Sequence, residues 1–179
     1  MDSNDILIFW FEEIDPSKWW TKDSQFDQMI SKRFKELHQA ASNCELFEWR
    51  KTPEGRLAEI IVLDQFSRNM YRDTALSFAT DPIALALAQE AISVGADAKL
   101  NQNQRSFLYM PFMHSESLVI HDVAVQLYTQ NGAQNSLDFE LKHRDIIQEF
   151  GRYPHRNAIL GRVSTPAELR FLTQANSSF

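Results

Sequence analysis

The chain has 179 residues, 44% of them hydrophobic and 23% charged, with a formal net charge of −6. This composition is typical of one globular domain, here residues 1–179, with enough apolar side chains to bury a core. The acidic balance argues against nucleic-acid and anionic-membrane partners, because both need a basic surface. The single cysteine excludes an internal disulfide, and no apolar run reaches the roughly 18 residues of a membrane span. We therefore expect a cytoplasmic protein.

The first third of the chain predicts three helices. A short apolar helix covers residues 6–11, and hydrophobic side chains recur at helical spacing over residues 24–42. The next helix has Thr52 as its N-cap and Pro53 in its first position, and both residues favour a helix start. It continues towards Arg68 and is apolar on most sides, so we expect it to be the central helix of the fold.

The rest of the chain predicts five more helices, over residues 83–94, 103–115, 116–131, 136–150 and 166–175. Pro111 should kink the second of these, because its ring removes an internal hydrogen bond. Thr165 and Glu168 predict a capping box at the start of the last helix, which should bury Leu169 and Leu172. About eight helices without a strand indicate an all-α fold of stacked helical hairpins, each about as long as a tetratricopeptide unit of ~34 residues.

The strongest candidate site is the stretch 150–162, which contains three arginines and a histidine but no acidic residue. Glycine and proline interrupt the helical pattern here, so the arginines should lie on a shaped loop. Guanidinium groups match carboxylate and phosphate geometry, which makes this loop a candidate anion site. Its candidate ligand-binding residues are Arg152, His155, Arg156, Asn157 and Arg162. The structural alternative is that these arginines cap helix ends and pair with carboxylates such as Asp145 and Glu149.

A second group of candidates lies at the end of the predicted central helix. Asp64, Arg68 and Arg72 recur every four residues and therefore share one face of a continuous helix. Either they form intrahelical salt bridges or, because their neighbours are apolar, the arginines are partly buried and need an anion. The candidate ligand-binding residues here are Asp64, Arg68, Asn69 and Arg72.

Three residues are candidates for proton transfer. His114 and Glu116 follow an apolar segment, and His143 lies on the apolar stripe of a later helix. Together with His121 they could supply two histidines and a carboxylate to a metal, but no dense ligand motif is present. The glycine motifs of phosphate loops, dinucleotide-binding folds and α/β-hydrolases are absent as well. We expect neither a metal nor a cofactor.

Four segments of the chain resemble the bacterial family called domain of unknown function 924, namely residues 63–72, 78–86, 109–116 and 150–157. The likeness extends from about Ile6 to Leu172. It implies an all-α fold like that of the tetratricopeptide superfamily, and it implies no established activity. The chain departs from the family pattern at Ser67, where proline is usual, and at His121, where glutamine is common. Ser67 should allow the helix to continue through Arg68.

Our first hypothesis is a pocket between stacked helical hairpins that binds an anionic small molecule through Arg and His side chains. His114, Glu116 or His143 would then transfer a proton in a hydrolase or lyase reaction, although nothing in the sequence selects a reaction. The alternative is a tetratricopeptide-like interaction module that binds a peptide carboxylate with the same arginines. The third hypothesis is a purely structural role of the polar cluster. A pocket predicts that Arg68, Arg156 and His143 converge in one concavity, whereas a structural role predicts that carboxylates or helix carbonyls satisfy every arginine.

Overall fold

The computed structural model describes residues 1–175 and residue 177. This part of the chain is helical and contains no strand, so the predicted all-α fold class is confirmed. The α-helices are α1 (Ser3–Ile8), α2 (Ser24–Ser42), α3 (Pro53–Ile61), α4 (Ser67–Met70), α5 (Asp81–Ser93), α6 (Gln102–Leu108), α7 (Met110–Met113), α8 (Leu118–Asn131), α9 (Gln134–Phe150) and α10 (Pro166–Leu172). Short 3₁₀ and π-helical segments extend or connect several of them. Among the described residues, no helix has both the length and the hydropathy needed to cross a bilayer.

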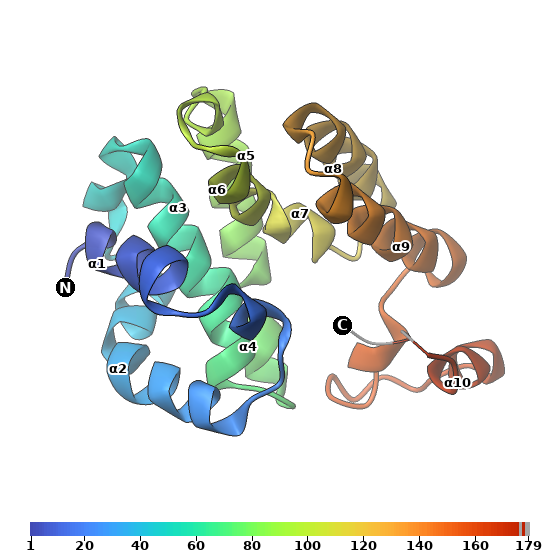
Figure 1. The fold of residues 1–179 in the computed structure, drawn as a ribbon. Helices are drawn as coiled ribbons and strands as arrows, with labels where there is room; N and C mark the ends of the chain where they lie inside the picture. Colours follow the sequence, from blue (N-terminus) through green and yellow to red (C-terminus); the bar gives the residue numbers. More distant parts are fainter. Residues whose placement is uncertain (176, 178–179) are drawn as a thin grey trace.

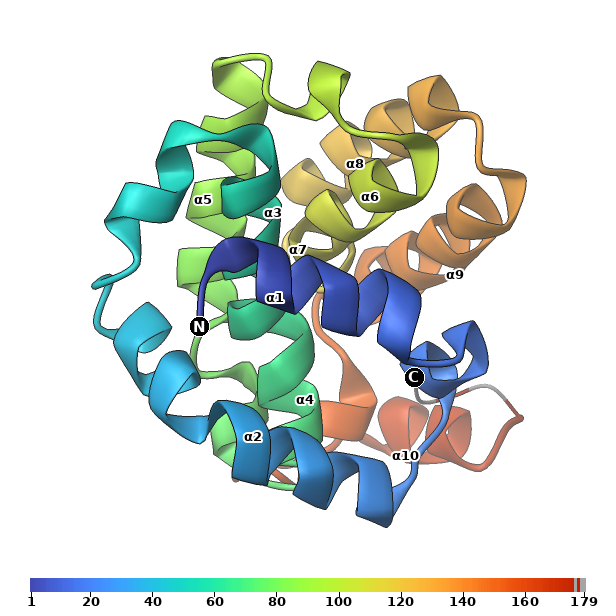
Figure 2. The same ribbon diagram turned by 60° about the vertical axis from the view of Figure 1, so that its left-hand side comes forward.

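The helices follow one another through space largely in chain order. α1 packs on α3, α3 on α5, α5 on α7, α7 on α8 and α8 on α9. Figure 1 shows α1 and α2 at one end of the molecule, α8 and α9 at the other, and α10 below α9. Figure 2 shows α1 and α2 together on the near side of α3 and α4. A site that joins the two ends must therefore be built by side chains from successive layers.

The predicted central helix is confirmed. The Thr52 hydroxyl accepts a hydrogen bond from the backbone N–H of Gly55 at 3.0 Å, and α3 begins at Pro53. Every residue in the range 57–66 is buried. Because apolar side chains on all sides of this helix leave water, it forms the middle of the main hydrophobic core.

The central helix widens into a π-helical turn at Val62–Phe66, between α3 and α4. The hydroxyls of Ser67 and Thr80 both donate to the backbone carbonyl of Leu63, at 2.6 and 2.7 Å. They keep this carbonyl paired where the regular pattern is interrupted. The chain stays helical through the turn and into α4, as expected from a serine at position 67. Such turns are frequent at functional sites, and this one carries Asp64.

The predicted helix over residues 103–115 is divided in the structure. α6 ends at Leu108, and Tyr109 separates it from α7. Pro111 lies in the first turn of α7, where a missing backbone N–H leaves no hydrogen bond unmade. The proline therefore marks the start of a short new helix, where the prediction was a kink in one long helix.

The last helix differs from its prediction in the face that it buries. The capping box at Thr165 is confirmed, but α10 ends at Leu172, before the predicted end near residue 175. The predicted burial of Leu169 is wrong, because this side chain is 56% exposed and Glu168 is buried in its place. Glu168 turns inward because it pairs with Arg152 at 2.6 Å.

The buried hydrophobic side chains form a main core and a smaller second cluster. The second cluster consists of Ile146, Ile147 and Tyr153, with Phe150 and Phe171 packed against it. It lies where the end of α9, the following loop and α10 meet, in the lower right of Figure 1. Since this cluster is separate from the main core, polar contacts carry much of the attachment of the C-terminal part.

Replacing Gly55 by alanine is expected to lower the free energy of unfolding by about 1–3 kcal/mol, because the new Cβ would collide with the backbone carbonyl of Trp49. Glu54→Ala, at the exposed neighbouring position, is the matched control and should stay within about 0.5 kcal/mol of the parent. Urea unfolding measures both variants. Equal stability of the two variants would contradict the expected collision.

Candidate functional site

Asp64 is the centre of the candidate site. It lies on the π-helical turn and is 1% exposed. Three groups contact its carboxylate, namely His114 Nδ1 at 2.8 Å, Arg68 Nη1 at 3.1 Å and Gln65 Nε2 at 2.6 Å. Burial alone would raise the pKa of Asp64, but the charge of Arg68 and the hydrogen bonds from His114 and Gln65 outweigh it and hold this pKa well below its usual range. Asp64 is therefore a buried carboxylate at neutral pH.

His114, directly after α7, is held in one tautomer. Because Asp64 is ionised, Nδ1 of His114 carries the proton and donates it to Oδ1 of Asp64. Nε2 keeps a lone pair, has no hydrogen-bond partner among the described residues, and is not one of their buried unpaired atoms, so it is open to solvent. Burial, followed by the charge of Arg68, lowers the pKa of His114, so the ring is neutral at neutral pH. A neutral imidazole that a carboxylate orients, with Nε2 unused and the side chain 15% exposed, can act as a general base.

Asp81, in the first turn of α5, joins two arginines. Arg68 donates two hydrogen bonds to its carboxylate, each 3.0 Å long, and Nη1 of Arg156 approaches the same carboxylate at 3.5 Å. Two carboxylates therefore face two guanidiniums, and the formal charges of the group balance. We call Asp64, Arg68, Asp81, His114 and Arg156 the central cluster.

Arg156 has an enclosed guanidinium whose hydrogen-bonding capacity is only partly used. The residue is 6% exposed, and its guanidinium lies 4.4 Å from the ring centroid of Phe78 and 4.6 Å from that of Tyr153. Nη2 donates to the backbone carbonyl of His114 at 3.1 Å, whereas the buried Nε has no partner among the described residues. Burial and the charge of Arg68 lower the pKa of Arg156. The two rings fix the plane of the guanidinium and leave part of its edge unpaired.

The loop that carries Arg156 is attached to the turn after α7 through Glu116. Arg162 donates two hydrogen bonds to Glu116, at 2.6 and 2.8 Å, and the backbone N–H of Tyr153 donates a third at 2.8 Å. The Tyr153 hydroxyl donates to the carbonyl of Met113 at 2.5 Å. Burial alone would raise the pKa of Glu116, but the hydrogen bonds from Arg162 and Tyr153 have the larger, opposite effect. The pKa is therefore lowered overall, and Glu116 is ionised. Both oxygens of this predicted catalytic residue are occupied in holding the loop.

His143 belongs to a group of histidines around Tyr153. The ring centroids of His121, His143 and His155 lie 6.3, 5.8 and 5.5 Å from that of Tyr153. Nδ1 of His143 is hydrogen-bonded to the carbonyl of Phe139 at 2.7 Å. Burial lowers the pKa of His143 to about 3, and burial together with a neighbouring arginine lowers that of His155 to about 4. Both rings are neutral at neutral pH and pack around the tyrosine next to Arg156.

Two predicted ligand-binding residues of the central helix lie apart from the central cluster. Arg72 donates to Asp27 of α2 at 2.6 and 2.8 Å, and the Asn69 side chain donates to the same carboxylate at 2.8 Å. Of the three residues expected on one helix face, only Asp64 and Arg68 pair with each other. The contacts of Arg72 and Asn69 tie α4 to α2.

Two predicted ligand-binding residues of the loop within residues 150–162 make contacts outside the central cluster. Arg152 pairs with Glu168 at 2.6 and 2.8 Å, which fastens the loop to α10. Asn157 donates to the hydroxyl of Ser164 at 3.0 Å. The structural alternative expected the arginines to pair with carboxylates such as Asp145 and Glu149. Arg152 does pair with a carboxylate, but its partner is Glu168.

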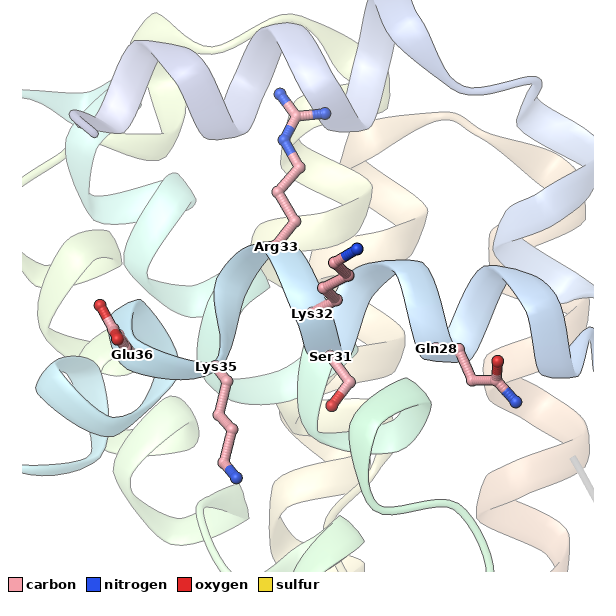
Figure 3. A pocket seen from close by; sticks show the side chains of 6 residues that line it. All are labelled: Gln28, Ser31, Lys32, Arg33, Lys35 and Glu36. Atoms are coloured by element: carbon pink, nitrogen blue, oxygen red, sulfur yellow. The ribbon is translucent and has the colours of Figure 1, made fainter.

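Two surface recesses lie away from these contacts. The larger has a volume of about 510 Å³, and the side chains that line it all come from α2, namely Gln28, Ser31, Lys32, Arg33, Lys35 and Glu36. Figure 3 shows them spreading outward from a single helix. Arg33 is paired with Glu13 at 2.6 Å. Because no second element closes this recess, and because neither recess includes a residue of the central cluster, we assign it no function. Within the described chain, no group of three or more His, Cys, Asp or Glu residues is arranged to hold a metal ion.

Sequence reasoning missed three residues of the site, which are Phe78, Asp81 and Tyr153. Asp81 lies just before the helix predicted over residues 83–94 and was not considered as a site residue, and the two aromatic residues have no charge that would suggest an anion site. A signal was nevertheless present, because Phe78 and Asp81 lie in the family-like segment 78–86 and Tyr153 lies inside the basic loop.

Comparisons with known proteins agree with this picture at the level of fold. The sequence matches, over residues 6–176, the family described as "Bacterial protein of unknown function (DUF924)". A solved structure of a protein of unknown function from Agrobacterium tumefaciens is similar to this one, with a TM-score of 0.90 and 42% sequence identity. The similarity covers 95% of this chain and 96% of that chain. A search of curated proteins found no match.

Proposed function

Because the chain belongs to the bacterial family of unknown function DUF924, whose description states no activity, we propose a function from the chain's own residues. The protein is a cytoplasmic protein that binds a small anionic molecule at Arg156. His114 exchanges a proton with the bound molecule, in a hydrolase or lyase reaction. The other residues of the central cluster position these two side chains.

The observation that carries this proposal is the state of His114. Its Nδ1 is committed to the buried carboxylate of Asp64, and no described residue hydrogen-bonds to its Nε2. His121, which is fully buried, satisfies both ring nitrogens inside the protein, with Glu140 at 2.7 Å and the Ser115 carbonyl at 2.8 Å, whereas His114 presents Nε2 outward. The unused nitrogen of His114 is available to a ligand.

Arg156 supports the binding half of the proposal. A guanidinium that is 6% exposed normally pairs closely with a carboxylate, as Arg68 does with Asp81 at 3.0 Å. Arg156 keeps 3.5 Å from that carboxylate, and its Nε lacks a partner among the described residues. Its Nη2 donates to the backbone of His114, so the guanidinium and the imidazole are adjacent. A ligand carboxylate or phosphate would complete the unpaired edge.

A thermal-shift screen of anionic metabolites and short peptides tests the proposal. A ligand that binds only the native state should raise the melting temperature of the wild type, by an amount that grows with ligand concentration. Arg156→Gln should lose these shifts, whereas the matched control Arg144→Gln should keep them, because Arg144 pairs with Asp122 on the surface. His114→Asn should lose turnover of any ligand that is a substrate, and its thermal shifts should be smaller than those of the wild type.

Two results would contradict the proposal. One is a set of shifts that Arg156→Gln leaves unchanged, because the ligands would then bind elsewhere. The other is the absence of any shift across the anion set, which would favour a purely structural role for the central cluster. Shifts produced by peptides alone would favour an interaction module that uses the same arginine. Circular dichroism checks that each variant is folded.

A further inference from the structure

The charges around His114 leave no net charge to attract an anion. Asp64 and Asp81 balance Arg68 and Arg156, and Glu116 on the same turn as His114 is balanced by Arg162. An anion that entered this enclosed place would therefore leave one negative charge uncompensated. Such a charge is costly away from bulk water unless a cation or a proton accompanies it.

His114 is the group that can accept this proton. The charged groups that act on its ring are Asp64 and Arg68 of the central helix and Asp81 of α5. From α9 it faces His143, which is neutral, and its backbone carbonyl meets Arg156 of the loop. His114 Nδ1 and Arg68 Nη1 lie 2.8 and 3.1 Å from the same oxygen of Asp64, so the ring is close to a fixed positive charge. That arginine disfavours a second proton on His114 in the free protein, and a bound anion would reverse this effect.

Two other histidines of this region, His121 and His143, are less suitable as proton acceptors. His121 lies between α8 and α9 and uses both ring nitrogens, with Glu140 and with the Ser115 carbonyl. His143 is buried against Tyr153 and uses Nδ1 for a backbone carbonyl. Protonation of Nε2 of His114 breaks no hydrogen bond with the described residues and keeps the bond to Asp64 intact.

We propose that the anion bound at Arg156 is a monoanion of the carboxylate class and that its binding adds one proton to Nε2 of His114. The carboxylate then lies between the unpaired edge of Arg156 and the new N–H of His114, and the complex is neutral again. A dianion, such as a phosphate monoester or sulfate, would leave one charge uncompensated, because only one nitrogen is available. This inference rests on the proposed function, and it assigns His114 the role of proton donor in the complex.

The linkage of binding to protonation makes the affinity depend on pH. Between the pKa of His114 in the free protein and the higher pKa in the complex, the affinity should fall about tenfold for each unit of rising pH. Below this interval His114 is protonated with or without the ligand, and the affinity should level off. A purely structural histidine would not change its titration when an anion is added.

Nuclear magnetic resonance titration of the histidine rings tests the inference, with sodium formate and sodium acetate as monoanionic probes and sodium sulfate as the dianionic probe. Sodium chloride at matched ionic strength is the reference. The pKa of His114 should rise in formate and acetate by more than in sulfate, and Arg156→Gln should abolish the rise. His38, which contacts Ser67 at 2.7 Å and lies outside the central cluster, is the internal control and should titrate alike in all salts.

The outcomes separate this inference from the proposed function. If formate or acetate shifts the Arg156 signals while the titration of His114 stays unchanged, the anion site stands and the proton uptake is overturned. If sulfate binds more tightly than the carboxylates, the assignment to monoanions is overturned. If no probe perturbs either residue, both proposals fail. Calorimetry in buffers of different ionisation enthalpy should independently count close to one proton taken up for each carboxylate bound.

Discussion

Replacing Asp64 by alanine is expected to lower the free energy of unfolding by about 3–5 kcal/mol. The substitution removes the carboxylate that His114, Arg68 and Gln65 share in a buried place. Arg68 keeps Asp81 as a partner but loses one of its two counter-ions. A buried donor without its acceptor costs more than the intact pair contributes, because the donor is neither hydrated nor bonded. Urea unfolding followed by circular dichroism measures the change.

Two further variants make this prediction specific. Asp145→Ala removes an exposed carboxylate from α9 and should change the stability by no more than about 0.5 kcal/mol. Asp64→Asn keeps an oxygen for Nδ1 of His114 but removes the charge, so its stability should lie between those of the wild type and Asp64→Ala. A loss of less than about 1 kcal/mol for Asp64→Ala would show that the pairing of Asp64 contributes little.

Acid is expected to destabilise the protein well before its carboxylates are protonated. Burial lowers the pKa of His143 to about 3 and that of His155 to about 4, whereas a histidine in the unfolded chain titrates near pH ~6.5. The unfolded state therefore takes up protons first as the pH falls. The stabilisation from each histidine is complete above pH ~6.5 and is lost progressively towards the folded-state value, at about 1.4 kcal/mol per pH unit for each histidine.

Urea unfolding at a series of pH values measures this slope, to which His143 and His155 together should contribute about two protons between pH ~6 and pH ~4.5. His143→Leu is the informative variant, because it removes one of the two groups whatever its effect on the stability at neutral pH. For this variant, the slope of the unfolding free energy against pH should correspond to about one proton fewer than in the wild type. A slope that matches the wild type would mean that His143 titrates normally in the folded protein.

The helical fold was predictable because its signals are local. Thr52 and Thr165 cap helices through their own side chains, and Gly132 ends α8 in the left-handed conformation that glycine adopts without strain. The π-helical turn at Val62–Phe66 was not predictable in this way. It depends on a hydroxyl from Thr80, which reaches the Leu63 carbonyl only after α5 has packed against the central helix.

The candidate site was predictable in its residue types and not in its pairings. Asp64, Arg68, His114 and Arg156 were identified as charged or titratable groups among apolar neighbours, and they meet in the central cluster. The pairs that hold them are formed between helices far apart in the chain. The bridge that Asp81 makes to both arginines depends on the position of the first turn of α5, which no spacing rule supplies.

The enclosure of Arg156 has a consequence for the speed of ligand association. The loop around it is fastened by Arg162 to Glu116 and by the Tyr153 hydroxyl to the Met113 carbonyl. Because Arg156 is only 6% exposed, we expect a molecule from solution to reach its guanidinium only after such contacts have opened. The association rate should therefore lie well below the diffusional limit and, at high ligand concentration, should level off at the rate of loop opening.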